Sequence, residues 1–271
     1  MLSVIITIIY FSSSVSAATP PSSLNNTTAK AATARNVTIN NESTILANKG
    51  VALYKLGKYN ESLVYLDKAL SINPNDFHAL IYKGQALDNL GNHTQAVALY
   101  NRTIVLADKA LAINPKFVNA LIDKGIALDI LGNYTQAIIY YDKALAINPK
   151  FVDALDDKGL SLDKLGNYTQ AIIYSDKALA INPNDINALD LKGRALDHSG
   201  NYTQAITYLD RALAINPKFV PALVEKGNAL GDLGNYTQAI IYYNQALALN
   251  SNFAEALNGK RQSLAALNQT N

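Results

Sequence analysis

The sequence predicts an all-α protein in which antiparallel helix pairs stack into a solenoid, and three observations predict it. The stretch 118–151, VNALIDKGIALDILGNYTQAIIYYDKALAINPKF, recurs at 152–185, 186–219 and 220–253. Within each copy, apolar residues stand three or four positions apart, which is the spacing of one face of a helix. Self-similarity at a fixed period of 34 residues is typical of stacked repeat arrays.

Each unit contains two predicted helices. In unit 118–151 their apolar faces are Leu121, Gly125, Leu128 and Leu131, followed by Tyr134, Ala137, Ile138, Tyr141, Ala144 and Leu145. Gly132-Asn133 separates them, because glycine tolerates the left-handed conformation that ends a helix. Pro149 ends the second helix, since proline lacks a donor and restricts the residue before it.

A glycine recurs inside the first helix of every unit. It costs about 1 kcal/mol relative to alanine at such a position, so its recurrence needs a physical reason. We interpret it as close approach of the paired helix, which leaves no room for a side chain. The glycines are Gly50, Gly84, Gly125, Gly159, Gly193 and Gly227.

The pattern resembles the tetratricopeptide repeat, whose marker residues are, in order, an apolar residue, Leu-Gly, Tyr, Ala, an aromatic residue and Pro at set distances. The corresponding residues here are Leu121, Gly125, Leu128, Gly132, Tyr134, Ala137, Tyr141, Ala144 and Pro149. Lys124 departs from the family, which usually has Leu before the glycine. The resemblance extends from about residue 43 to the C-terminus. It implies a right-handed superhelix whose first helices line a concave groove.

The chain divides into a leader, a tether, six repeats and a cap. Residues 1–17 are apolar and then small, which fits a secretory signal peptide cleaved near Ala17. An uncleaved membrane anchor and a cytosolic protein are the alternatives. Residues 18–42 are rich in Ser, Thr, Asn and Pro and predict a disordered tether. The repeats are 43–76, 77–117, 118–151, 152–185, 186–219 and 220–253, and 254–271 form a capping helix and tail.

The second repeat is seven residues longer than the others, and the extra residues fall near 101–107, in its second helix. Seven residues are close to two helical turns, so the insertion lengthens that helix by about 10 Å without rotating its apolar face. The added Ile104, Val105 and Leu106 either rest on neighbouring helices or form a protruding surface for dimerisation or docking.

The predicted capping helix repeats the pattern of a first helix. Its apolar face is expected to contain Leu257, Leu264 and Leu267, with Arg261 at the position of the marker glycine. Lys260, Arg261 and Gln262 are expected to face water.

Composition argues against several classes of function. Cysteine is absent, which excludes disulfides and Cys-based metal sites. The 23 basic residues nearly balance the 21 acidic ones, so a basic footprint for nucleic acid is not expected. His78, His93 and His198 lie outside any catalytic motif, and no phosphate-binding glycine loop occurs. We expect no enzymatic activity, no cofactor and no metal; a Ca²⁺ site on the aspartates matches no known loop spacing.

The resemblance places groove residues three positions before the marker glycine and one, four and five after it. Aspartates at the fourth position form a row along the groove, which we call the Asp row (Asp88, Asp129, Asp163 and Asp197). Like charges on a concave wall favour a basic partner; the alternative is that these aspartates pair with lysines such as Lys158 and Lys192. The candidate groove residues are Asp88, Ile122, Ile126, Asp129, Asp156, Leu160, Asp163, Lys164, Asp190, Arg194, Asp197, His198 and Asn228.

Asn-x-Ser/Thr sequons recur in the turn between the two helices of a unit, at Asn92, Asn133, Asn167, Asn201 and Asn235. They predict glycosylation along one rim of the stack, with the groove left open. The alternative is that Gly-Asn-Tyr is an ordinary turn of this repeat, copied by duplication.

Together these features predict a non-catalytic scaffold that binds a protein or peptide in the concave groove. The signal peptide and the sequons predict a secreted or cell-surface glycoprotein. No nucleic-acid partner is expected, and no membrane span unless the signal remains uncleaved. The alternative function is a structural spacer of the cell envelope without a specific ligand.

Overall fold

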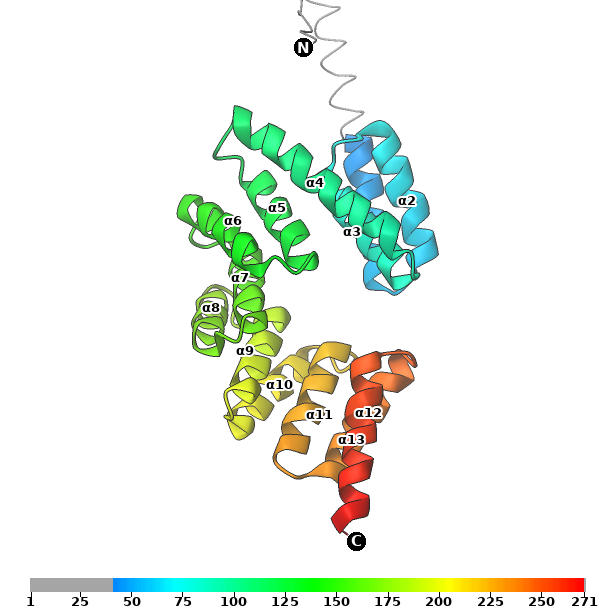
Figure 1. Cartoon of the computed structure of the whole chain (residues 1–271), viewed down its shortest axis with the longest axis vertical. Coiled ribbons are helices and arrows are strands. Elements are labelled where there is room, and N and C mark those ends of the chain that lie inside the picture. Colours follow the sequence, from blue (N-terminus) through cyan, green and yellow to red (C-terminus); the bar gives the residue numbers. More distant parts are fainter. Residues whose placement is uncertain (1–40, 271) are drawn as a thin grey trace, which may run out of the picture.

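The computed structural model describes residues 41–270, which contain thirteen helices and no strands. The helices follow one another along an arc that runs from the N-terminal repeats to the C-terminal helix (Figure 1). The leader predicted for 1–17 and nearly all of the tether lie outside the described residues; residues 41 and 42, assigned to the tether, already belong to the first helix.

The helices alternate between first and second members of each repeat. Their bounds are α1 41–55, α2 Tyr59–Ile72, α3 Phe77–Asn89, α4 His93–Ile113, α5 Val118–Ile130, α6 Tyr134–Ile147, α7 Val152–Lys164, α8 Tyr168–Ile181, α9 Ile186–His198, α10 Tyr202–Ile215, α11 Val220–Asp232, α12 Tyr236–Leu249 and α13 Ala254–Thr270. The prediction of two helices per repeat and one helix after the sixth repeat is confirmed.

The turn between the two helices forms as the sequence predicts. Gly132 has φ of 80°, in the left-handed region, and its N–H donates to the carbonyl of Asp129 at 2.9 Å. The N–H of Asn133 donates to the carbonyl of Leu128 at 2.8 Å. These bonds satisfy carbonyls that the end of α5 would otherwise leave unpaired. At the far end of the repeat, α6 ends two residues before Pro149.

The first helices lie on the inner side of the arc. Each helix packs against its neighbours in sequence, and consecutive first helices also contact one another, from α3·α5 through α11·α13. Consecutive second helices make no such contacts within the described residues. The second helices are therefore splayed apart on the outside, and the first helices line the concave face.

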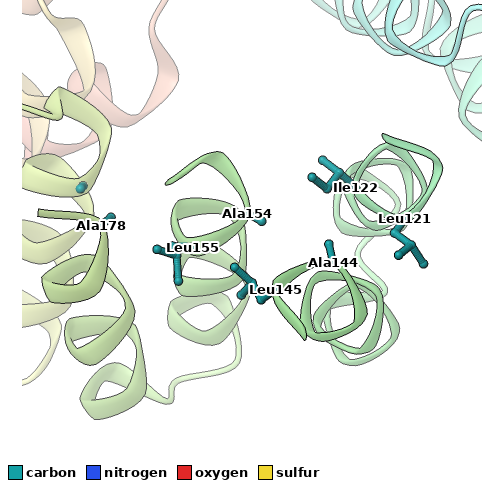
Figure 2. Packing of buried hydrophobic residues seen from close by; sticks show 8 residues of the cluster. Leu121, Ile122, Ala144, Leu145, Ala154, Leu155 and Ala178 are labelled. Carbon is teal, nitrogen blue, oxygen red and sulfur yellow. The ribbon is translucent and has the colours of Figure 1, made fainter. Parts of the chain in front are cut away.

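The core is a thin layer that each repeat completes with its neighbour. Figure 2 shows Leu145 of α6 pointing toward α7, next to Ala154 and Leu155, with Ala144 close to Ile122 of α5. All five side chains are at least nine-tenths buried. Because one helix pair cannot cover its own apolar face, the repeats are stable only as a stack.

The marker glycines allow close approach, as predicted, but not always to the paired helix. A β-carbon at Gly125 would lie 2.5 Å from the ring of Tyr141, on the second helix of the same repeat. At Gly159 the nearest atom is instead Cδ2 of Leu191, at 2.6 Å, on the first helix of the next repeat. Ser175 stands where other repeats have Tyr or Leu, so the neighbouring repeat fills this space.

The insertion lengthens α4 as predicted, to 21 residues against 14 in α6. Thr103 and Ala107 are fully buried, and Ile104 packs against the cluster around Tyr100. Val105 is 52% exposed. The inserted turns therefore rest mainly on neighbouring helices, which supports the first of the two interpretations.

The apolar face predicted for the capping helix α13 is wrong at two of its leucines. Leu257 and Leu264 are 48% and 43% exposed, whereas Gly259 is buried against Tyr243. Arg261, expected at the glycine position, is exposed. The equivalent leucines of the sixth repeat, Leu223 and Leu230, are buried because α12 and α13 pack on α11, and no described helix covers α13 in the same way.

The lysine that precedes the marker glycine joins consecutive repeats on their outer side. The Nζ of Lys158 donates to Asp142 of the preceding repeat and, at 2.6 Å, to the hydroxyl of Tyr174 in its own repeat. Lys192 bonds Asp176 and Tyr208 in the same way. The alternative that these lysines pair with the Asp row is therefore wrong.

Candidate functional site

A cavity of about 550 Å³ lies on the concave face, between residues of α1, α3, α5, α7 and α9. Four carboxyl groups line it, which we call the acidic cavity residues (Asp123, Asp153, Asp156 and Asp157). Ile122, Ile126 and Tyr82 supply apolar walls, and Lys55 and His78 are the basic residues of the lining. This arrangement is a polar hollow, rich in carboxyl groups and with apolar walls.

Burial raises the pKa of three of these carboxyl groups, those of Asp123, Asp156 and Asp157, and makes them hard to ionise together. Desolvation raises the pKa of Asp156 to about 8, with Asp185 and Asp153 adding repulsion. The pKa of Asp157 is raised well above its ordinary value, first by burial and then by the neighbouring carboxylates. One oxygen of Asp156, Oδ1, has no hydrogen-bond partner among the described residues. A positive charge brought into the cavity would relieve this repulsion.

His78 offsets only part of this negative charge. Its Nδ1 lies 3.8 Å from Oδ1 of Asp123, and the attraction of this carboxylate raises the pKa of His78. His78 also contacts the ring of Tyr82, with centroids 4.8 Å apart. The remaining acidic cavity residues have no cationic partner within the described part of the chain.

The acidic cavity contains three of the groove residues predicted from sequence, namely Ile122, Ile126 and Asp156. Sequence reasoning missed Asp123 and Asp157, which stand two positions before the marker glycine, in a row that the family pattern did not assign to the groove. The adjacent pair Asp156-Asp157 was the available signal, because consecutive helix residues lie about 100° apart and can both border the same groove. Leu160 is half-buried and Lys164 is exposed, and neither lines this cavity.

The Asp row is not a row of free charges. Asp88 accepts a hydrogen bond of 2.7 Å from the hydroxyl of Tyr100 and lies 3.0 Å from Nδ1 of His93. Asp129 accepts a hydrogen bond from the hydroxyl of Ser161 in the next repeat. These two carboxylates are therefore held by partners within the chain.

Asp163 is the most completely neutralised member of the Asp row. Its Oδ2 lies 2.9 Å from Nε of Arg194, and its Oδ1 lies 3.1 Å from Nδ1 of His198. The hydrogen bond with Asp163 raises the pKa of His198. Arg194 and His198, which were predicted to contact a ligand, thus serve first as partners of an aspartate in the preceding repeat.

The remaining predicted groove residues gather toward the C-terminal repeats. Asp190 is buried, its Oδ1 lacks a hydrogen-bond partner among the described residues, and burial together with Glu225 raises its pKa to about 8. Asp197 and Asn228 line a second cavity, of about 430 Å³, between α9, α11, α12 and α13. The hydroxyl of Tyr243 donates to Oδ1 of Asn228 at 2.8 Å.

The five repeated sequons occupy equivalent, exposed positions. Asn92, Asn133, Asn167, Asn201 and Asn235 are the N-cap residues of α4, α6, α8, α10 and α12. Only Asn167 accepts a hydrogen bond from the helix through its side chain, from the N–H of Gln170. The other four amides do not cap their helices, and that of Asn201 donates instead to the hydroxyl of Ser199 at 3.0 Å. All five asparagines are exposed.

Residues 41–270 offer neither a metal cluster nor a membrane-spanning helix. No group of three or more His, Cys, Asp or Glu side chains there is arranged to hold a metal ion. No helix in that range combines the length and the apolar character required to cross a bilayer.

Family models match the repeats. Models described as tetratricopeptide repeat match residues 43–76 and 118–151, 65–98 and 140–173, and 224–269, which together span more than half of the chain. A model of anaphase-promoting complex, cyclosome, subunit 3 matches residues 164–246. No curated protein sequence matches the chain.

Solved structures share the architecture at low sequence identity. A tetratricopeptide repeat protein from Parabacteroides merdae is 20% identical with a TM-score of 0.61, over 82% of this chain and 84% of its own. A thermophilic TPR protein from Thermus thermophilus is 23% identical with a TM-score of 0.56, over 69% and 98%. A chain of the APC/C hetero-tetramer Cut9-Hcn1 is 18% identical with a TM-score of 0.60, over 85% and 46%.

The repeat boundaries, the marker residues in their structural places and the matches in sequence and fold agree with one another. This chain belongs to the tetratricopeptide repeat family.

Proposed function

We propose that the protein is a non-catalytic scaffold whose concave face binds a basic segment of another protein. The observation that carries this proposal is the acidic cavity, in which four carboxyl groups from two adjacent first helices converge on one hollow. A lysine or arginine side chain would stabilise the ionised form of these carboxyl groups and pair with them, which raises affinity and selects against acidic segments. A chain in the Cut9-Hcn1 hetero-tetramer, itself a protein complex, shares this fold.

Binding to short fluorescent peptides tests the proposal directly. Each probe is a lysine-containing peptide, with a matched peptide in which glutamine replaces every lysine. We expect saturable binding of the lysine peptide by fluorescence anisotropy, weakened by salt because surface charges are screened. The double variant Asp153→Asn and Asp156→Asn should weaken this binding at least tenfold.

The control removes the same number of charges from the outer face. The double variant Glu61→Gln and Asp67→Asn changes two exposed carboxylates on α2, a second helix, and should bind as wild type does. Equal binding of the lysine and glutamine peptides, or equal loss in both double variants, would contradict the proposal. A chain that acts only as a spacer would bind neither peptide, and its function would depend only on repeat number.

We further propose that the protein works outside the cytoplasm and carries glycans on its repeated sequons. The sequence of the leader supports export, and the exposed N-cap asparagines leave the concave face uncovered when modified. Mass spectrometry of the natively expressed protein should find a mature N-terminus near residue 18 and glycopeptides at several of these asparagines. An intact leader together with unmodified sequon peptides would refute this part.

A further inference from the structure

The C-terminal end of the concave face holds a carboxylate whose expected partners are missing. In the fourth repeat, Asp163 is neutralised by Arg194 and His198 of the fifth repeat. One period later the carboxylate is Asp197, and the two residues equivalent to Arg194 and His198 are Asn228 and Asp232. The sixth repeat thus has an amide, Asn228, where the fifth has the cation of Arg194, and a second carboxylate, Asp232, where the fifth has the imidazole of His198.

Asp197 is enclosed rather than solvated. Only 4% of the residue is exposed, and its Oδ1 has no hydrogen-bond partner among the described residues. A buried acceptor without a partner is costly, so such atoms ordinarily find one in the protein, in water or in a ligand. Asp197 lines the second cavity, and the space beside it is about 430 Å³.

The groups that surround Asp197 in the second cavity are neutral or negative on α11, α12 and α13. From α11, Asp232 and Glu225 repel it, and after burial they are the causes that raise the pKa of Asp197 to about 7. His198, its neighbour on α9, acts in the opposite direction. Tyr236 and Tyr243 of α12, and Gln262 and Ser263 of α13, contribute neutral polar groups to the lining.

We propose that this second cavity binds the guanidinium group of an arginine side chain from the partner, with Asp197 as its buried ion-pair acceptor and Asp232 as a second acceptor at the rim. The chain itself supplies the precedent, because Arg194 stands in the equivalent place against Asp163. A guanidinium presents a planar set of donors that suits two acceptors at once, and it stacks on aromatic rings such as that of the half-buried Tyr236. The proposal deepens the proposed function and rests on it, since a segment lying along the concave face would place one basic residue here.

A small probe separates this site from the acidic cavity. N-acetylargininamide is titrated into the ¹³C-labelled full-length protein, and the carboxyl carbon of Asp197 is followed by NMR. We expect saturable shifts of Asp197 and its neighbours, with binding that strengthens about tenfold from pH 6 to pH 8 as the carboxyl group ionises. The neutral isostere N-acetylcitrullinamide should produce no saturable shift.

Two variants and one control keep the test decisive. Asp197→Asn, which preserves size, should weaken binding of N-acetylargininamide at least tenfold. Asn228→Arg restores the internal cation, so it should block the probe and raise the melting temperature. Asp176→Asn, on the outer face, should leave binding unchanged.

Three results would overturn the inference. The first two are equal affinity of wild type and Asp197→Asn for N-acetylargininamide, and equal affinity of wild type for the arginine and citrulline probes. The third is displacement of N-acetylargininamide by calcium chloride at matched ionic strength, which would indicate an inorganic cation site. Because the probe is a single blocked residue without lysine, and Asp153 and Asp156 are intact in every variant, failure here leaves the lysine-peptide test unaffected. Failure of that peptide test, likewise, leaves the NMR result interpretable.

Discussion

Replacing the marker glycine of the third repeat by alanine should destabilise the array. A β-carbon at Gly125 would lie 2.5 Å from Cε1 and 2.9 Å from Cδ1 of Tyr141, whose side chain is 1% exposed. Carbon atoms in favourable contact lie about 3.5–4.0 Å apart, so the ring must move by about 1 Å within a close-packed core. Overpacking of this kind costs about 1–3 kcal/mol, and the better helix propensity of alanine offsets about 1 kcal/mol. We expect a net loss of up to about 2 kcal/mol.

The fourth repeat supplies a matched control. At Gly159 the β-carbon would meet Cδ2 of Leu191 at 2.6 Å, but its other contacts are 3.4 Å or longer. The end of a leucine side chain can rotate away, so Gly159→Ala should be nearly neutral once the propensity gain of about 1 kcal/mol is included. A difference of up to about 2 kcal/mol between the variants corresponds to up to about 8 °C in melting temperature.

Thermal melts followed by circular dichroism measure this difference. Because repeat arrays can unfold in segments, the full melting curves of wild type and both variants are compared rather than one midpoint. Gly125→Ala should melt below Gly159→Ala. If Gly125→Ala melts at or above Gly159→Ala, close approach is not the reason for the glycine in the third repeat.

Two further perturbations test other parts of the fold. Burial raises the pKa of Asp190 to about 8, so the folded state binds the proton of this carboxyl group more tightly than the unfolded state does. The resulting stabilisation of the folded state is present below the ordinary pKa of aspartate and is lost as pH rises toward 8. Asp190→Asn should therefore stabilise the protein at pH 8, on the order of 1–3 kcal/mol, and flatten the decline of urea midpoints between pH 5 and 8; an unchanged pH profile would show that Asp190 ionises freely. Deletion of residues 101–107 joins Tyr100 directly to Asp108, the spacing found in regular repeats, so helicity per residue and oligomeric state should be retained in circular dichroism and light scattering. A changed oligomeric state would instead assign the inserted turns to an interface.

The sequence by itself determined the local structure and the order of the elements. The 34-residue period, the glycine between the helices and the proline after them place every helix, because each acts through backbone conformation within a few residues. The length of α4 followed in the same way, since seven residues add nearly two turns whatever lies beside them. The family pattern also identified the first helices as the inner face.

Only the tertiary structure decided which charges are free. Asp163 and Asp197 stand at the same position of consecutive repeats, yet one is neutralised by Arg194 and His198 and the other faces Asn228 and Asp232. Their difference depends on residues one repeat away that the stacking brings within a few ångströms. The same holds for the acidic cavity, whose carboxyl groups converge because α5 and α7 lie side by side. A periodic sequence shows which residues occupy equivalent positions in the repeats. The charge of a site depends instead on the positions at which neighbouring repeats differ, because stacking brings those side chains next to it.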